Sequence, residues 1–354
     1  DPLEMRIIVV DHEIVWPVEW LNRHIPLHIP SILFTEENLL CLILLKMGHY
    51  QMATDYAENL ILVNHLELYR ALSEGTSLSG EVLSALHDYN KGLYAQYSSY
   101  GDYSNALNYW QKAEETFEGD DWKIMSRKHQ AVLLSDLGND EKALKISLST
   151  LETYNLSQQA KASMALDIAG FLANYTLTNS SDHMIRQTND CVDFGLAFFK
   201  QYKCQLEEAM MMVDLGQIKG SMENFHASLN LFDSGIYQFK ELEFPDLMYH
   251  AIYRKAKMLH QWSQNGNSQF YKLALESYNI ALKYYSQEDD AETFFEIHSQ
   301  LAMVYAEIPS DGNQNAIWAA FSATSFKEAL DFYAQAGDQN KYASVANNYA
   351  NALI

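Results

Sequence analysis

Apolar residues recur at intervals of three and four along most of the chain, as in residues 37–61, ENLLCLILLKMGHYQMATDYAENLI. This spacing places them on one face of an α-helix. Four of the six prolines fall within the first 30 residues, and none occurs between Ser31 and Phe244. Proline clashes with the helix interior, so its absence leaves that long stretch open to continuous helices. The pattern predicts an almost entirely helical chain.

One segment departs from the helical spacing. Residues 6–16, RIIVVDHEIVW, carry their apolar positions in short runs. The segment is compatible with a short strand, an extended arm or part of a capping helix. We therefore expect residues 1–35 to form an irregular N-terminal arm or cap.

Four segments share one frame, in which a small residue follows a glycine by five positions. They are MGHYQMATDYA (47–57), YGDYSNALNYW (100–110), LGNDEKALKIS (137–147) and LGQIKGSMENF (215–225). The glycine permits the turn that ends one helix. The small residue lets the next helix approach its partner closely, and a bulky residue four positions later fills the adjoining space. Each segment is predicted to be the turn and second helix of a helical hairpin.

This frame resembles that of the tetratricopeptide repeat family over roughly residues 36–354. In that family small residues stand where the paired helices touch. The first-helix positions here are Cys41, Tyr94, Ala131, Ala169, Ala209, Ala256, Ala302 and Ala350, all small except Tyr94. The second-helix positions are Ala53, Ala106, Ala143, Cys191, Ser221, Ala274 and Ser322. The resemblance implies an all-α, right-handed superhelical solenoid of about seven antiparallel helix hairpins, continuing beyond Ile354 or capped by another chain.

The repeats are longer than those of the family. Successive first-helix positions are 37 residues apart from Tyr94 to Ala131 and 53 apart from Cys41 to Tyr94, against about 34 in the family. Extra residues fall between paired helices, as in residues 263–268 and 308–315. Long helices and loops of this kind resemble the arrays of bacterial sensor and regulatory proteins.

The charge balance restricts the possible partners. The chain has 24 Lys and Arg residues against 46 Asp and Glu residues, a formal net charge of −22. Nucleic acids and anionic membranes attract clustered basic residues, so neither is expected as a partner. No apolar run is long enough to span a membrane. Three cysteines, Cys41, Cys191 and Cys204, are too few for a disulfide framework, which favours a reducing compartment and a cytoplasmic location.

The sequence shows no motif that indicates catalysis, a metal or a cofactor. His24 and His28 have a four-residue spacing, but Pro26 between them prevents the helix that would direct both at a zinc ion. The methionines of residues 207–214, EEAMMMVD, are predicted to fill the core rather than to form a soft binding surface. The acidic residues at 289–292 are predicted to mark a helix start. We expect no enzyme activity.

The resemblance implies a binding groove on the concave side, lined by the first helices. The matching residues are Lys91, Ser98, Lys128, Tyr253, Lys257, His260 and Asn351. Chaperone-binding members of the family clamp a peptide carboxylate there with lysine and asparagine. Lys91 and Lys128 match the lysine, but Ala95 and Val132 replace the asparagine, so we favour solvated lysines over a clamp.

The function expected from these features is a scaffold that binds a protein or peptide segment in its groove. The net charge of −22 favours a partner of basic character, because an acidic protein attracts cations. The alternative is a ligand- or peptide-responsive regulatory region of a larger multidomain protein, such as a sensor or a caspase-like peptidase, whose output domain lies outside this sequence.

Overall fold

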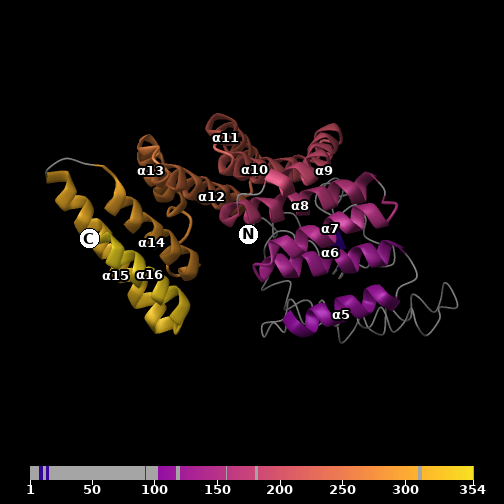
Figure 1. Cartoon of the computed structure of the whole chain (residues 1–354), viewed down its shortest axis with the longest axis horizontal. Helices are drawn as coiled ribbons and strands as arrows, with labels where there is room; N and C mark the ends of the chain where they lie inside the picture. The colour runs from indigo at the N-terminus through magenta and orange to yellow at the C-terminus, as the bar shows by residue number, and fades with distance from the viewer. Residues whose placement is uncertain are drawn as a thin grey trace. The chain divides into compact units, whose positions relative to one another are not determined.

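The computed structural model describes residues 8–10, 13–15, 92, 103–116, 120–156, 158–179, 182–309 and 313–353 (Figure 1). The described part is helical apart from one small hairpin of strands β1 (Ile8–Val10) and β2 (Glu13–Val15). These strands pair antiparallel, with Val9 opposite Ile14. The sequence left three structures open for residues 6–16, and the segment contributes two short strands to this hairpin. In the other described residues the predicted all-helical class is confirmed.

The chain divides into two compact units, residues 1–214 and residues 215–354, with the boundary inside α10. Unit 1 contains α5 (Tyr103–Thr116), α6 (Asp120–Asp136), α7 (Asp140–Thr153), α8 (Gln158–Thr178), α9 (Asp182–Gln201) and most of α10 (Gln205–Ser221). Unit 2 contains the end of α10, α11 (Phe225–Glu241), α12 (Pro245–Gln264), the 3₁₀ turn η2 (Ser268–Phe270), α13 (Tyr271–Ala281), α14 (Ala291–Glu307), α15 (Asn313–Ala336) and α16 (Gln339–Ala352).

Helices that are neighbours in sequence pack against each other within each unit. In unit 1, α5 packs on α6, α6 on α7, α7 on α8 and α8 on α9. In unit 2 the same holds for α11 with α12, α12 with α13, α14 with α15 and α15 with α16. Three pairs of helices that are two apart in sequence also meet among the described residues: α6 with α8, α12 with α14 and α14 with α16. This is the packing that stacked helical hairpins require.

Most of the small residues identified from the sequence lie in tight contacts between helices. In unit 1, Ala106, Ala131, Ala143, Ala169 and Ala209 are at most 1% exposed, and in unit 2 Ala256, Ala274 and Ala302 are fully buried and Ser322 is 4% exposed. Cys191 is half-buried. Ala350 is exposed, contrary to its assignment, because α16 meets the neighbouring core through Val345 and Tyr349 instead. Cys41, Ala53 and Tyr94 lie outside the described residues.

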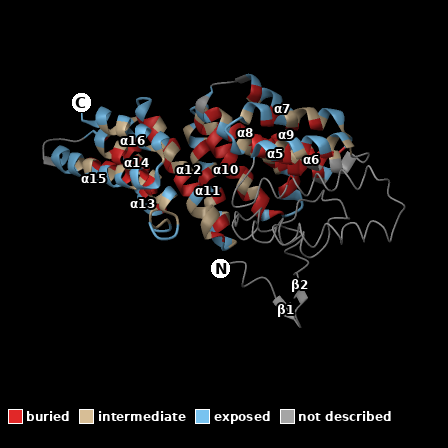
Figure 2. Ribbon diagram, turned by 90° about the horizontal axis from the view of Figure 1, so that it is seen from below, coloured by how far each residue is buried: buried red, intermediate tan, exposed pale blue. Residues whose placement is uncertain are grey.

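Large aromatic side chains fill the spaces between these small residues, and buried positions line the faces where helices meet (Figure 2). Trp110 of α5 is fully buried. The ring centroids of Phe225 and Phe270 lie 4.7 and 5.0 Å from the ring centroid of Trp262 on α12. Its indole N–H donates to the carbonyl of Gly220 at 3.0 Å, so this buried tryptophan also has its polar group satisfied. The space-filling role predicted for Trp110 is therefore confirmed, whereas Phe225 does not share a helix with Ser221, because α10 ends at Ser221 and α11 begins at Phe225.

Two further local predictions are confirmed. Within residues 207–214, Met211 is fully buried and Met212 is 9% exposed, as core residues should be. Asp290 is the N-cap of α14, and its side chain accepts a hydrogen bond from the backbone N–H of Thr293 at 3.0 Å. The carboxylate thus satisfies one of the N–H groups that a helix start leaves unpaired.

The turns between helices repeat one hydrogen-bonded motif. After α11, the N–H of Phe244 donates to the carbonyl of Phe239 at 2.9 Å, and the N–H of Glu243 donates to the carbonyl of Lys240 at 3.1 Å. This is the Schellman motif, which requires a left-handed residue just past the helix. In the part of the chain that the structure describes, the left-handed residues are Gly138, Lys203, Glu223, Glu243, Gly266 and Gly337. Half of them are not glycine, so the turn is imposed on residues that disfavour it.

One turn was predicted at the wrong place. Gly216 was assigned to a turn and Ser221 to the second helix, but α10 runs through Gly216 and ends at Ser221. The turn follows at Glu223, with φ of 57°. Gly216 instead permits a close helix approach, since a Cβ there would lie 3.0 Å from the Phe232 ring. The small residue facing it is Ser228, whose hydroxyl donates to the Gly216 carbonyl at 2.7 Å.

Replacing Glu243 with glycine should stabilise unit 2. Glu243 is exposed and has φ of 59°, a conformation that costs a side-chain-bearing residue about 1–2 kcal/mol. After the greater entropy of glycine in the unfolded chain is subtracted, we expect a gain of roughly 0.5–1 kcal/mol in the free energy of unfolding. Urea denaturation measures it. Lys240→Gly, three residues earlier on the exposed side of α11, should instead cost about 1 kcal/mol. Destabilisation by both variants would contradict the role given to the left-handed turn.

Candidate functional site

Three of the residues that the sequence assigned to the groove lie together at the contact between α12 and α14. Tyr253, Lys257 and His260 are spaced by four and three positions on α12, so they share one face. Their partners on α14 are Glu296 and Glu307, which were not identified from the sequence. The contact formed by these five side chains, with Gln264, Tyr271 and Tyr278, is called the α12–α14 seam below.

Glu296 organises one end of the seam. The hydroxyl of Tyr253 donates a hydrogen bond to Glu296 Oε1, and the Lys257 ammonium lies 3.6 Å from the same oxygen. That ammonium also sits 5.2 Å from the centroid of the Tyr253 ring, within the range of a cation–π interaction. Burial, and after it the charge of Glu296, raises the pKa of Tyr253, so its hydroxyl remains a donor.

Glu307 organises the other end. His260 Nε2 lies 2.8 Å from Glu307 Oε2, and the side-chain amide of Gln264 donates to both carboxylate oxygens at 3.0 and 3.1 Å. The hydroxyl of Tyr271 donates to Glu307 Oε2 at 3.4 Å. Burial alone would raise the pKa of Glu307, but the hydrogen bonds from His260 and Gln264 outweigh it, and the pKa lies below its ordinary value. Glu307 is therefore a carboxylate at neutral pH.

The seam is partly open to solvent. The side chains of Lys257 and Glu296 are 40% and 37% exposed, and that of Glu307 is 30% exposed. Tyr253 and His260 are buried. The seam therefore combines a polar rim with buried aromatic groups beneath it, an arrangement that suits non-covalent recognition.

Polar side chains also join α14 to α16. Lys341 at the start of α16 forms an ion pair with Glu292 on α14. Arg254 on α12 donates from Nε to the side-chain oxygen of Gln217 on α10 at 2.8 Å. Polar side chains thus link each first helix of unit 2 to the next. Asn351, the remaining predicted groove residue of unit 2, is exposed on α16, outside the α12–α14 seam.

In unit 1, the Lys128 side chain is bound by two residues of the same chain. Its ammonium donates to Ser163 Oγ at 2.7 Å and pairs with Asp167 Oδ2 at 2.8 Å, and both partners belong to α8. The expectation of a solvated lysine is wrong for Lys128, because the stacking of α6 on α8 brings this carboxylate to it. Lys91 and Ser98 lie outside the described residues, as do His24 and His28.

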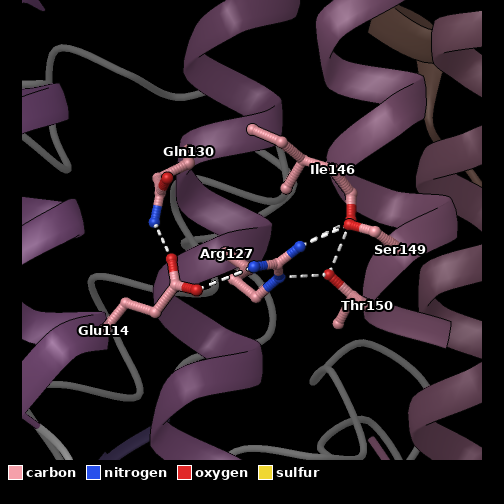
Figure 3. Close-up of polar contacts among 6 residues, drawn as sticks. All are labelled: Glu114, Arg127, Gln130, Ile146, Ser149 and Thr150. Carbon is pink, nitrogen blue, oxygen red and sulfur yellow. Dashed lines mark hydrogen bonds and ion pairs between the residues drawn. The ribbon is translucent and has the colours of Figure 1, made fainter. Parts of the chain in front are cut away.

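A second polar cluster in unit 1 surrounds Arg127 of α6 (Figure 3). Its Nη1 pairs with Glu114 Oε1 on α5 at 2.7 Å, and its Nε donates to Thr150 Oγ1 on α7 at 2.7 Å. Nη2 donates to Ser149 Oγ and to the carbonyl of Ile146 at 3.4 Å. Gln130 donates to the other oxygen of Glu114 at 2.7 Å. One guanidinium thereby joins three helices, which marks the cluster as a structural element.

The free energy of unfolding of unit 1 should fall as the pH falls, because His129 is buried in its neutral form. The ring of His129 stacks on Trp110, with centroids 4.3 Å apart. Burial, and after it the charge of Lys128, lowers the pKa of His129 to about 3. An unfolded histidine titrates near 6.5 and binds the proton more readily, so stability is fully present above pH 6.5 and falls between pH 6.5 and 3. The loss from this residue should reach roughly 3 kcal/mol at pH 4.

The measurement compares urea denaturation of the wild type and His129→Phe between pH 4 and 8. Phenylalanine keeps an aromatic ring against Trp110 and cannot titrate, so the difference isolates the histidine from carboxylates that titrate in the same range. The stability of the variant should depend less on pH. Parallel profiles would contradict a buried neutral His129.

Among the described residues, no group of three or more histidine, cysteine, aspartate or glutamate side chains is placed to hold a metal ion. No helix in this part of the chain is long and apolar enough to cross a membrane.

No protein-family model matches the sequence, and comparison with curated proteins gives no match.

Proposed function

We propose that this chain is a protein- or peptide-binding scaffold of the tetratricopeptide-repeat type, a right-handed superhelix of helix hairpins that acts without catalysis. The observation that carries the proposal is the direct contact of successive first helices in unit 2. Because α14 meets both α12 and α16, their half-exposed polar side chains form one surface across several hairpins. Stacked repeats bind extended segments on such surfaces.

The proposed binding surface is the first-helix face, defined as the side of α12, α14 and α16 that carries Lys257, Glu296, Gln300, Glu307 and Lys341. On α14 the residues Glu296, Gln300 and Glu307 are spaced by four and seven positions and are all half-exposed, so they form one stripe. Two of the three are carboxylates. With the net charge of −22, this favours a partner segment of basic character.

We place the scaffold in the reducing cytoplasm, away from membranes and nucleic acids. Three cysteines in 354 residues are consistent with this. Cys191 is a free thiol, and burial raises its pKa to about 11. A thiol that stays protonated is a poor nucleophile and fits a structural role.

The test is site-specific photo-cross-linking in cells of the source organism. A photoreactive phenylalanine analogue replaces Gln300 on the first-helix face of α14 or, as the matched control, exposed Gln335 on the second helix α15. The proposal expects a discrete cross-linked partner from position 300 and none from position 335. Equal cross-linking from both, or from position 335 alone, would move the binding surface to another face.

A further inference from the structure

Lys257, Tyr253 and Glu296 together form a site of the kind that proteins use to hold an organic cation. The Lys257 ammonium lies 5.2 Å from the Tyr253 ring centroid and 3.6 Å from Glu296 Oε1. An aromatic face with an adjacent carboxylate attracts cations through the ring quadrupole and the negative charge together. Here the cation present is the chain's own lysine.

The hold on Lys257 is loose compared with that on Lys128, another lysine of the predicted groove. Lys128 is 2.8 Å from its carboxylate with a side chain 15% exposed, whereas Lys257 is 3.6 Å from its carboxylate with a side chain 40% exposed. A distance of 3.6 Å exceeds that of a hydrogen bond, and exposed lysine pairs contribute little to stability. Lys257 can therefore leave the site for solvent at small cost.

Beneath this site lies an unsatisfied polar group. The hydroxyl of Tyr278, on α13, is buried and has no hydrogen-bond partner among the described residues. The Tyr278 ring centroid is 6.0 Å from that of Tyr253 and 6.4 Å from that of His260, which places it under the middle of the seam. A buried hydroxyl without a hydrogen bond costs free energy, so a bound group that supplied one here would be favoured.

The Tyr278 hydroxyl experiences the negative charge of both carboxylates of the seam. Burial first, and then the charges of Glu296 and Glu307, raise the pKa of Tyr278 well above its ordinary value. The group is therefore neutral, and its oxygen can accept a hydrogen bond from an N–H donor. A cation that carries N–H groups would meet the Glu296 carboxylate and the Tyr253 ring in one place, with the Tyr278 ring 6.0 Å from that of Tyr253.

We propose that the α12–α14 seam binds the guanidinium group of an arginine in the partner segment, and that Lys257 occupies this place in the free protein until the arginine displaces it. The proposal rests on the scaffold function proposed above and names the side chain that its first-helix face recognises. Arginine fits better than lysine, because a planar guanidinium stacks on an aromatic ring and offers several N–H donors in fixed directions.

The test uses a fluorescein-labelled nonapeptide, GSGSRSGSG, and the same peptide with citrulline in place of arginine. Citrulline has nearly the same shape but no charge. Fluorescence anisotropy at low salt measures their binding to the full chain. We expect the arginine peptide to bind and the citrulline peptide not to bind. Lys257→Met should tighten the arginine complex about three- to fivefold, the factor expected from removing an exposed internal ion pair.

The matched control is Lys255→Met. Lys255 lies two residues away on α12 and pairs with Asp233 at 2.6 Å on α11, away from the seam. This variant makes the same change in net charge, so it measures the purely electrostatic gain. Equal tightening by the two variants would overturn the displacement of Lys257, and binding of citrulline as tightly as arginine would overturn the cation site.

Glu296→Gln should abolish arginine binding. Because Glu296 also holds Tyr253, circular dichroism must show that this variant retains its helix content and thermal midpoint. If it is unfolded, the Lys257→Met comparison decides the question alone. If photo-cross-linking at position 300 captures a partner but the seam does not prefer arginine to citrulline, the arginine site is contradicted and the scaffold function is not. If the arginine peptide binds but photo-cross-linking captures no partner, the scaffold function is contradicted and the arginine site is not.

Discussion

Trp110→Ala should lower the free energy of unfolding of unit 1 by about 3–5 kcal/mol, the range for truncating a large buried aromatic residue. Trp110 is fully buried on α5 and stacks on His129 of α6. On its other side lies Gly92, where a Cβ would come within 2.8 Å of the indole. Neighbours on both sides leave no side chain ready to collapse into the space, so the cavity should persist.

Urea denaturation followed by far-ultraviolet circular dichroism measures this loss. Tyr103→Ala is the matched control, because Tyr103 lies on the same helix with 44% of its surface exposed. It should change stability by less than about 0.5 kcal/mol. A loss below about 1 kcal/mol for Trp110→Ala would show that the packing of α5 on α6 is not the core of unit 1.

The small residues at helix contacts could be predicted because their signal is local. Ala106, Ala143 and Ala274 stand at fixed distances from apolar neighbours, and a small side chain is needed wherever two helices approach closely. Each of them is fully buried. The absence of proline likewise indicated long helices directly, because proline acts on the helix that contains it.

The turn at Glu223 could not be predicted, because its cause is not local. Glycine is the usual sequence marker of a turn, and this rule predicts a turn at Gly216, which lies inside α10. Glu223 adopts the left-handed conformation with φ of 57° because the hydrogen bond from Asn224 N–H to the Lys219 carbonyl, 2.9 Å long, closes the helix end. Packing of α10 against α11 stabilises that turn, and a glutamate in the sequence does not predict a left-handed conformation.

The seam was only half predicted for a similar reason. Tyr253, Lys257 and His260 lie on one face of α12, and their spacing shows this. Their partners lie far along the chain, as Glu307 does at 47 residues from His260. That pairing depends on how α12 stacks on α14. The facing side chains are 43 residues apart for Tyr253 and Glu296 and 47 apart for His260 and Glu307, so no single offset from one helix to the next could be used to find both carboxylates.

Arg127→Met should destabilise unit 1 by about 2–3 kcal/mol. Methionine keeps much of the aliphatic stem of arginine but removes every polar contact of the guanidinium, including the 2.7 Å pair with Glu114 and the 2.7 Å hydrogen bond to Thr150. Removing one partner of a fully buried pair costs about 3–5 kcal/mol. The side chains of Arg127 and Glu114 are 19% and 21% exposed, so water will partly screen the stranded carboxylate and reduce the loss.

The double variant Arg127→Met with Glu114→Gln identifies the cause of that loss. If a stranded charge is the main penalty, neutralising Glu114 should restore roughly 1 kcal/mol, because neighbours in one network are coupled by about 0.5–3 kcal/mol. Glutamine can also keep accepting from Gln130, which donates to Glu114 Oε2 at 2.7 Å in the wild type. Lys142→Met, at an exposed position of α7, controls for the loss of a positive charge. Should Arg127→Met cost no more than Lys142→Met, the guanidinium would not be what joins α5, α6 and α7.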